Sequence, residues 1–526
     1  MLAWLLLPNF ILLYIYNDSL PPVIIFLLVL SITTLLYFYI FPSIRWFGLF
    51  NIPFALFSGV YAAYIFVYKS IPYEGMWFSV WDMVYLELFE LGRYYLDLII
   101  LNLFGFLLYV ICVLSVGNPQ NSRRAHQKPV LLAGLVIVLC IVVGQNFYSD
   151  RIATGQHGFE NSFVQSFPLG MAFQAYSTWS ESNRHDDKIQ NASIPDLERT
   201  SAPLQGKEIY ILVIGETARA DRWMADVQYN DYDGIESSNT VVFEDTFSQA
   251  NFSDGSLHLL MTGTSTFQEA EGTDTLPIIS KAADCQTIWI SNNKAYRYAW
   301  QADYSVITEQ TTATPLMKRF DHAMLPVIYR AIKQSERRVC LVIHLLGSHF
   351  SYKYRYSHEF MQKNVNISDY EDKNSKGHIK ALLNAYDNSI HATNDFLNQI
   401  INFVKKQSAT SLVLYTSDHG ENIYDDDRGL FQHIMRTPSK YEVSVPFFIW
   451  GSDLFISNFP DKWSNLVKNS NRPVSNRQIL PTYVDLLGVN YENNYFSASL
   501  FSDYSVDSPR YVLAPDLRLL SEIEIR

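Results

Sequence analysis

A glutamate and an aspartate–histidine pair are the residues whose types and positions first suggest chemistry. Glu216 directly follows the apolar run "EIYILVIG", and Asp418 and His419 directly follow the run "SLVLYTS". Two carboxylates and an imidazole form the mixed oxygen and nitrogen ligand set that zinc accepts. If the fold brings these side chains together, we expect them to bind zinc, either one ion or two.

Each of these residues also has a purely structural interpretation. Glu216 is compatible with an acid in the first turn of a helix, Asp418 with an N-cap and His419 with an ordinary surface imidazole. Taken singly, these interpretations are the better ones. They leave unexplained why one apolar run after another ends in a polar group, so we favour the functional interpretation for "SDHGEN".

Two serines between these motifs are candidate nucleophiles. Ser253 and Ser256 lie in "NFSDGSLHLLMTG", just ahead of a short apolar run with helical spacing that Gly263 closes. A serine at a helix N-terminus has an electropositive environment, and coordination to zinc would lower the pKa of its hydroxyl further. Serine is equally a preferred N-cap, so we expect one of the two to have that structural role.

The elements that must position these residues are short apolar runs alternating with helical segments. The runs read as strands buried on both faces: "EIYILVIG", "TIWISNN", "VCLVIHLLG", "SLVLYTSDHG" and "VPFFIWG". Segments such as "LLNAYDNSIHATNDFLNQIINFVKK" have apolar residues at helical spacing. This alternation predicts an α/β fold in which a mainly parallel sheet lies between two layers of helices.

A parallel sheet places its functional site beyond the carboxyl ends of its strands. Polar groups able to bind a metal or a phosphate follow four of the five runs: Glu216; Asn292, Asn293 and Lys294; His349; and Asp418 with His419. We therefore expect these side chains to meet at one edge of the sheet.

The motifs, in their order and approximate spacing, resemble those of membrane phosphoethanolamine transferases. They are "GETARA", the serine-containing stretch before "LLMTG", "LGSH", "AYDNSIHATNDF", "YTSDHGEN", "SVPFFIW" and "ILPTYVDLLGV", from about residue 207 to 490. That family modifies lipid A and related lipopolysaccharide sugars, and it includes the transferable colistin-resistance enzymes. The resemblance implies an α/β/α sandwich of the alkaline phosphatase and sulfatase type.

The resemblance also assigns roles to individual residues. It implies that Glu216, Asp418 and His419 bind zinc. The family's nucleophile, usually threonine, falls on Ser253, which is then both catalytic residue and metal ligand. Ser256 stays the alternative nucleophile.

Three further positions match residues that bind the substrate phosphate. His349 matches one such histidine, and His433, in "LFQHIM", matches another. Lys294 matches a phosphate-binding lysine more loosely. The resemblance thus implies that phosphoethanolamine passes from phosphatidylethanolamine, through a covalent phospho-serine intermediate, to a lipid A or lipopolysaccharide core sugar. We expect the enzyme to be a monomer.

Related activities remain as alternatives. A phosphoglycerol transferase, or a metal-dependent phosphodiesterase acting on another envelope glycan, would share the fold, the anchor and the chemistry. A sulfatase activity would need a C/S-x-P-x-R motif, and "SDGSL" has Gly255 and Leu257 in place of the proline and arginine. Cys285 and Cys340 allow at most one disulfide bond in the exported part, fewer than the lipid A enzymes commonly have, which leaves the acceptor open.

The first 149 residues predict a transmembrane domain of five helices, followed by a connector over residues 150–206 and a periplasmic catalytic domain over residues 207–526. The five apolar stretches run from Leu2 to Tyr16, Val23 to Ile40, Trp46 to Val67, Leu96 to Val116 and Val130 to Val143. The basic residues of the short loops are Arg45, Arg123, Arg124 and Lys128, which places the N-terminus in the cytoplasm. We expect "YEGMWFSVWDMVYLELFELGRYY" and part of the connector to contain helices in the membrane interface.

Charge and composition exclude other classes of protein. The formal net charge of −12 argues against a nucleic-acid partner, since nucleic-acid-binding proteins present a basic patch. A transporter or membrane scaffold would need polar residues inside the spans. The few that we find, such as Asn9, Ser31 and Asn102, make that interpretation weak.

Overall fold

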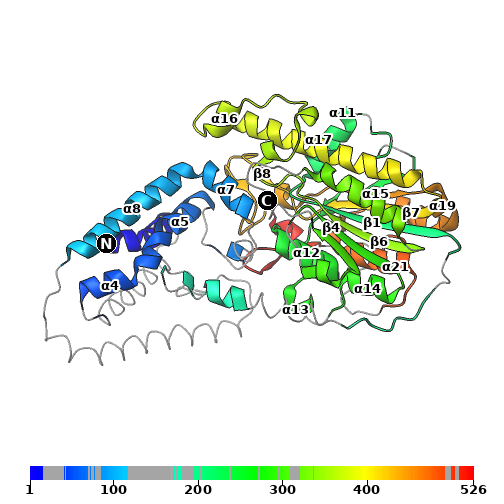
Figure 1. Ribbon diagram of the computed structural model, residues 1–526, viewed down its shortest axis with the longest axis horizontal. Coiled ribbons are helices and arrows are strands. Elements are labelled where there is room, and N and C mark those ends of the chain that lie inside the picture. Colours follow the sequence, from blue (N-terminus) through cyan, green and yellow to red (C-terminus); the bar gives the residue numbers. More distant parts are fainter. Residues whose placement is uncertain are drawn as a thin grey trace. The chain divides into compact units, whose positions relative to one another are not determined.

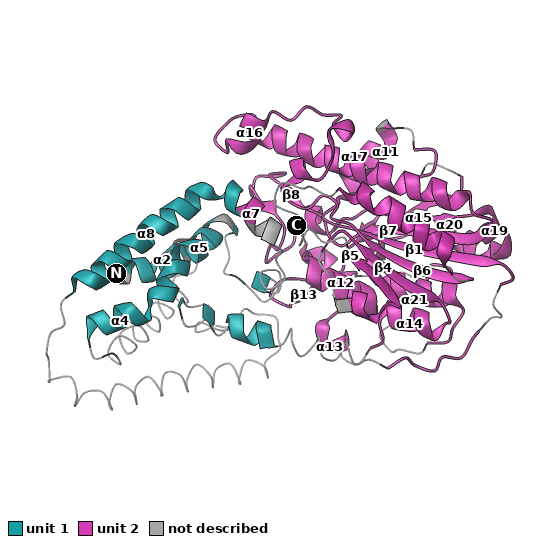
Figure 2. Cartoon of the chain, in the orientation of Figure 1, with its two compact units in different colours: residues 1–77, 92–180 teal, residues 78–91, 181–526 magenta. Residues whose placement is uncertain are grey.

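The structure is a computed structural model. It describes residues 1–15, 41, 43–68, 72, 76–77, 85–116, 167–168, 171–172, 174–180, 193–200, 204–230, 232–235, 238–270, 273–293, 297–307, 320–335, 337–491, 499–503 and 509–525. The chain divides into two compact units (Figure 2). The first unit holds residues 1–77 and 92–180, and the second holds residues 78–91 and 181–526.

The second unit is built on a seven-stranded mixed sheet with the strand order β2-β10-β7-β1-β6-β4-β5 (Figure 1). From β7 to β5 the neighbouring strands are parallel, whereas β10 runs antiparallel to both β7 and β2. The bounds are β1 (Lys207–Gly215), β2 (Thr240–Val242), β4 (Gln286–Ser291), β5 (Tyr304–Ile307), β6 (Arg338–His344), β7 (Ala409–Ser417) and β10 (Phe447–Gly451). Three small sheets pair β3 (Thr246–Phe247) with β11 (Val474–Ser475), β8 (Asn422–Ile423) with β9 (Phe431–Gln432), and β12 (Tyr511–Leu513) with β13 (Leu519–Ser521).

Helices cover both faces of the large sheet (Figure 1). One layer contains α11 (Ala220–Tyr229), α15 (Leu325–Gln334) and α17 (His378–Lys405), and the other contains α12 (Ser253–Thr262), α14 (Leu276–Ala282) and α21 (Ile479–Leu487). Other helices of this unit are α13 (Phe267–Ala270), α16 (Ile367–Glu371), α18 (Lys440–Val443), α19 (Asp453–Asn458) and α20 (Pro460–Asn469). Short 3-10 helices are η2 (Arg297–Gln301), η4 (Asp321–Met324), η5 (Tyr352–Tyr354), η6 (His358–Phe360), η7 (Asn476–Gln478) and η8 (Glu522–Glu524).

The alternation of side chains along β1 explains why the sheet needs both layers. Tyr210, Leu212 and Ile214 belong to the core cluster that also contains Leu257 and Leu260 of α12. The residues between them point to the opposite face of the sheet and are equally inaccessible to solvent. A strand that is apolar on both faces is stable only between two helical layers.

The predicted α/β fold is confirmed in its main features. All five predicted runs form strands, namely β1, β4, β6, β7 and β10, and the predicted long helix is α17. The sheet is mixed because β10, unlike the other four, is antiparallel to its neighbours. The edge strands β2 and β5 were not predicted, since runs of three and four residues give too little periodicity.

The two cysteines of the second unit form a disulfide bond. Cys285 directly precedes β4, and Cys340 lies on the neighbouring strand β6, where it pairs in register with Thr287. The bond closes a loop with a sequence separation of 55 residues. The one bridge that the cysteine count allows is therefore present.

We expect the Cys285→Ala and Cys340→Ala double variant to be less stable by about 2–4 kcal/mol, because a cross-link of this loop length restricts the unfolded chain. The check is thermal unfolding of the full chain in detergent, followed with and without reductant. Cys112→Ala is the control, since Cys112 has no disulfide partner. An unfolding midpoint that is insensitive to reductant would count against the bond.

In the first unit, α8 (Leu96–Ser115) is long and apolar enough to cross a membrane. Helices α4 (Ile44–Phe50) and α5 (Ile52–Tyr68) meet the same criterion only as a pair, which is bent by 62°. Large apolar side chains of α8 are exposed, among them Leu101, Phe104, Leu107 and Leu114. This exposure distinguishes α8 from the core helix of a water-soluble protein.

The prediction of five continuous spans needs correction within the described residues, where one or two candidates are seen. The predicted first span is divided into α1 (Leu2–Leu5) and α2 (Leu7–Ile15), each too short to cross a bilayer. The third is bent around Asn51, the C-cap of α4. The second and fifth, residues 23–40 and 130–143, lie outside the described residues.

Two polar residues of the predicted spans have structural partners. Asn9 and Phe167 exchange hydrogen bonds between the Asn9 side-chain amide and the Phe167 backbone, at 3.0 and 3.1 Å. The side-chain Nδ2 of Asn102 donates to the carbonyl of Leu56 at 2.9 Å. The Asn102 bond joins α8 to α5, and interhelical hydrogen bonds of this kind hold apolar helices together. The two asparagines therefore give no support to a transport pathway. The third polar residue, Ser31, lies outside the described residues.

Candidate metal and nucleophile site

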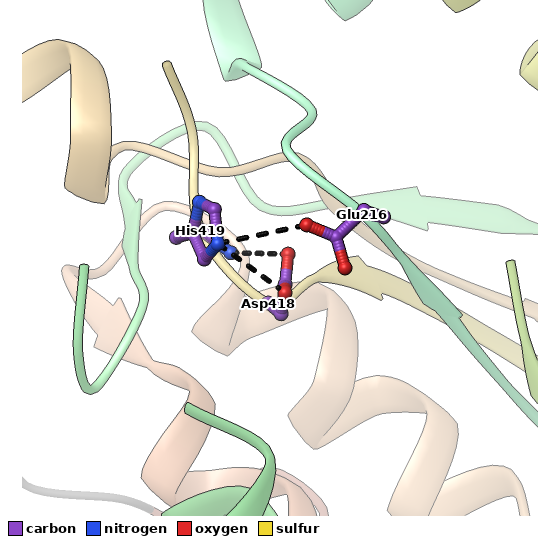
Figure 3. Close-up of side chains that lie close together, drawn as sticks. All are labelled: Glu216, Asp418 and His419. Carbon is purple, nitrogen blue, oxygen red and sulfur yellow. Dashed lines mark hydrogen bonds and ion pairs between the residues drawn. The ribbon is translucent and has the colours of Figure 1, made fainter. Parts of the chain in front are cut away.

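The register of β1 and β7 brings three predicted metal ligands together (Figure 3). These strands are parallel neighbours, and their last residues, Gly215 and Ser417, pair with each other. Glu216 and Asp418 therefore leave the sheet side by side, and the amide of Asp418 donates to the carbonyl of Gly215 at 3.1 Å. His419 follows directly in the chain.

The three side chains form a compact buried cluster. His419 Nε2 lies 3.6 Å from Glu216 Oε1 and 3.5 Å from Asp418 Oδ2. One ligand atom from each residue lies within 4.8 Å of the others, and all three residues are buried. Within the described ranges, no other group of three or more His, Cys, Asp and Glu side chains has this spacing.

The hydrogen bonds around the cluster fit a bound cation. Asp418 Oδ1 accepts from the amides of Thr217 and His419 at 3.0 and 2.7 Å, while the buried Oδ2 has no hydrogen-bond partner. An unpartnered buried carboxylate oxygen is costly, and a cation would remove that cost. His419 Nδ1 donates to the carbonyl of Gly420 at 2.8 Å, so Nε2 keeps its lone pair on the side of the carboxylates. Two carboxylates and one imidazole nitrogen suit zinc.

Electrostatics at the cluster lead to the same conclusion. Burial raises the pKa of the Asp418 carboxyl above its usual value. Burial, together with the charge of His433, lowers the pKa of His419 to about 4. A divalent cation would favour the ionised carboxylate and the neutral imidazole at once, and these are the protonation states in which both groups bind metal.

Ser253 faces this cluster from the start of α12. Its Oγ lies 3.1 Å from His419 Nε2 and 3.4 Å from Glu216 Oε1. Ser256 is buried one turn further along, and its Oγ donates to the carbonyl of Ala250 at 2.9 Å. The expectation that one serine is the N-cap is wrong, because the N-cap is Phe252. Ser253 is already the first helical residue, and its hydroxyl is directed to His419 and Glu216.

The loop that carries Glu216 is held in an uncommon conformation. Thr217 has a φ of 60°, which is rare for a β-branched residue. The Tyr386 hydroxyl fixes this turn, since it donates to the carbonyl of Thr217 at 2.7 Å and accepts from the amide of Arg219 at 3.0 Å. Gly347 lies so close that a Cβ there would be 2.8 Å from the backbone nitrogen of Glu216, so only glycine fits.

His433 lies beside the cluster. Its ring centroid is 4.1 Å from that of His419, and its Nδ1 is 3.1 Å from Glu421 Oε1. Burial raises the pKa of the Glu421 carboxyl to about 8. The contact between the two side chains fixes the orientation of the His433 ring.

His349 follows β6 in the loop "LGSH". Its Nδ1 is 2.6 Å from the carbonyl of Phe350, so that nitrogen acts as the donor. Burial, with the charges of Arg355 and His433, lowers the pKa of His349 to about 3. His349 and His433 are therefore near enough to influence each other electrostatically.

The depressed pKa of His349 predicts a loss of stability in acid. The folded protein keeps this ring neutral, whereas the unfolded chain binds a proton near the ordinary pKa of 6.5, so stability falls as the pH drops from about 6.5 towards 3. Because the ring is partly exposed, we expect about 1–2 kcal/mol, discounted for solvent screening. The test compares thermal unfolding of wild type and His349→Gln at pH 7 and pH 4.5. The variant should lose less stability; equal losses would contradict the assignment.

The residues around the cluster include some that the sequence predicted and some that it did not. Lys294 lies outside the described residues. Asn293, one of the polar residues predicted to follow β4, donates from Nδ2 to Glu216 Oε2 at 3.1 Å. Glu421 was missed as a site residue although it stands inside the motif "SDHGEN". Tyr386 was also missed, although it stands inside the motif "AYDNSIHATNDF", because its contact with Thr217 spans 169 residues of sequence.

Comparison with known proteins gives the following likenesses. The family model described as Sulfatase matches residues 208–489. The phosphatidylethanolamine transferase Mcr-2 of Escherichia coli is 28% identical over 381 residues, covering 65% of this chain and 67% of that protein. The membrane phosphoethanolamine transferase EptA of Neisseria meningitidis has a similar fold, with a TM-score of 0.67 at 16% identity over 88% of each chain. The periplasmic domain of EptC from Escherichia coli, solved in complex with Zn, has a TM-score of 0.53 at 20% identity, covering 63% of this chain and 98% of that domain.

These likenesses confirm the resemblance to phosphoethanolamine transferases and the alkaline phosphatase and sulfatase type of fold. The matches cover only part of the length of several relatives. Other transferase relatives from Escherichia coli are 24% identical, and this chain spans 58% of one and 41% of another. The chain thus matches about half the length of these curated relatives.

Proposed function

The chain belongs to the sulfatase family, and from this premise we propose that it is a zinc-dependent phosphoethanolamine transferase of the bacterial inner membrane. The observation that carries the proposal is the position of Ser253 Oγ, 3.1 Å from His419 Nε2 and 3.4 Å from Glu216 Oε1 in a buried ligand cluster. A hydroxyl in that place can be a nucleophile. Relatives whose names describe the transfer of phosphoethanolamine support the type of reaction.

The proposed reaction has two steps. Ser253 Oγ attacks the phosphorus of phosphatidylethanolamine, the bond to the diacylglycerol oxygen breaks, and phosphoethanolamine stays on the serine. A hydroxyl or phosphate oxygen of lipid A or of a lipopolysaccharide core sugar then displaces the serine. Zinc held by Glu216, Asp418 and His419 would supply positive charge that lowers the pKa of the serine hydroxyl.

The protein's own side chains do the remaining work. Asn293 and Thr217 donate hydrogen bonds to Glu216 and so fix the carboxylate beside the nucleophile. His349 and His433 are the histidines that would bind the phosphate oxygens. Because Nδ1 of His349 donates to the carbonyl of Phe350, Nε2 of the neutral ring can take the proton of the attacking oxygen, and the protonated ring can then donate to a phosphate oxygen or to the leaving oxygen. Lys294, the third residue after β4 in the sequence, would add a positive charge.

The N-terminal part would confine this chemistry to the membrane. We propose that residues 1–149 form a transmembrane domain with the N-terminus in the cytoplasm. Residues 150–206 would form the connector, and residues 207–526 a periplasmic catalytic domain. The exposed apolar side chains of α8 support a membrane location for that helix. Because donor and acceptor are both lipids, anchoring raises their effective concentration at the site.

The test is a comparison of lipopolysaccharide from a Gram-negative host that expresses either the wild-type chain or Ser253→Ala. We expect mass spectrometry to find lipopolysaccharide heavier by one phosphoethanolamine group with the wild type only. Unchanged lipopolysaccharide, together with modification of another envelope glycan, would support the phosphodiesterase or phosphoglycerol transferase alternative. Equal modification by both chains would reject the proposed mechanism.

A further inference from the structure

The second compact unit contains a segment that is remote in sequence from the catalytic domain. Residues 78–91 belong to this unit together with residues 181–526 (Figure 2). The segment includes most of α7 (Tyr85–Tyr94), which directly precedes the apolar helix α8. One acidic residue of α7, Glu90, is buried.

Glu90 contacts the loop that carries His349. Its Oε2 pairs with Nη2 of Arg355 and accepts from the amide of Ser351 at 3.2 Å. The side chains of Glu90 and Arg355 are 7% and 2% exposed, so solvent screens this ion pair little. A carboxylate held by both a guanidinium and a backbone amide has a single well-defined position.

Arg355 in turn holds the backbone at His349. Its Nε donates to the carbonyl of His349 at 2.7 Å, and its Nη2 donates to the carbonyl of Phe350 at 2.9 Å. The same Phe350 carbonyl accepts from His349 Nδ1. The guanidinium thus fixes the backbone from which the imidazole projects and the acceptor that sets its ring orientation.

We propose that Glu90 is a positioning residue for His349, supplied from outside the catalytic domain by the segment that precedes the α8 helix. This inference rests on the proposed function, since it deepens the role given there to His349. Glu90 offsets the buried charge of Arg355 and holds the amide of Ser351, and Arg355 then fixes the His349 backbone. Loss of Glu90 leaves a buried guanidinium without its carboxylate, which frees the loop and displaces the imidazole.

The first measurement follows the loop itself and does not depend on activity. Hydrogen exchange is recorded for the full chain in detergent, for wild type, Glu90→Gln and Glu371→Gln. Glu371 is the matched control, because its carboxylate pairs with Lys353 of the same loop but is exposed. We expect the Ser351 amide to exchange about tenfold faster in Glu90→Gln alone. Equal exchange in all three proteins would overturn the proposal.

The second measurement is a double-mutant cycle on the release of diacylglycerol from phosphatidylethanolamine. We expect Glu90→Gln to lower kcat/KM about 10–100-fold, as loss of an outer positioning group commonly does, with zinc content unchanged. In a His349→Ala background the same substitution should have little further effect. If Glu90→Gln costs the same factor in both backgrounds, Glu90 does not act through His349. If the wild type releases no diacylglycerol, the proposed function fails, and the exchange experiment still decides the role of Glu90.

Discussion

Ser253→Ala is expected to lower the transfer of phosphoethanolamine by about 10³-fold or more, because it removes the atom to which the group becomes attached. Only the oxygen is lost, and the Glu216, Asp418 and His419 cluster stays in place. We therefore expect zinc content and the unfolding midpoint to change little. The measurement is the rate of diacylglycerol release from phosphatidylethanolamine in detergent, with zinc determined in the same samples.

Ser256→Ala is the matched control for this variant. It removes the same kind of oxygen one turn along the same helix, where the hydroxyl donates to the Ala250 carbonyl. We expect a loss of stability of about 1 kcal/mol and nearly full activity. Ser253→Thr should stay within about tenfold of wild type, because it keeps the nucleophilic oxygen. An active Ser253→Ala with an inactive Ser256→Ala would move the nucleophile to Ser256.

The second large effect is expected from loss of a metal ligand. Glu216→Gln should reduce zinc binding and lower the rate by about 10³-fold, since it removes one of the negative charges that hold the cation. Loss of the cation then removes the positive charge that would stabilise the reacting oxygen. A chelator should inactivate the wild type, and added zinc should restore it. Metal analysis and activity are measured on the same full-length protein in detergent.

Glu208→Gln separates this effect from a general loss of stability. Glu208 is buried near the start of β1, the strand that ends directly before Glu216. Its Oε2 lies 3.2 Å from Nε of Arg338. We expect this variant to unfold at a lower temperature and to keep its zinc. Retention of zinc and activity by Glu216→Gln would remove this residue from the metal site.

The fold was largely predictable because its signals are local. A strand buried on both faces is apolar throughout, as in β1 and β7, and such runs are visible in the sequence alone. The direction of β10 was not visible, because a buried run reads the same in parallel and antiparallel sheets. The bend between α4 and α5 was also missed, although Asn51 and Pro53 interrupt the apolar run there and both disfavour the interior of a continuous helix.

The candidate site was predictable where function concentrates at strand ends. Glu216, Asp418 and His419 stand directly after β1 and β7, and the parallel register makes their proximity a consequence of topology. Residues that act through a second side chain gave no such signal. Glu90 and Arg355 are 265 positions apart, and neither belongs to a motif with a known spacing. Contacts of this kind depend on tertiary packing, which sequence patterns do not encode.

The most direct test of the account is to trap the covalent intermediate. The full chain is incubated briefly with phosphatidylethanolamine and no acceptor, quenched in acid, digested and examined by mass spectrometry. We predict one phosphoethanolamine group on the peptide that contains Ser253, absent from Ser253→Ala and from protein stripped of zinc. An adduct on a different residue, or steady turnover of the donor by Ser253→Ala, would contradict the claim that Ser253 reacts at the Glu216, Asp418 and His419 cluster.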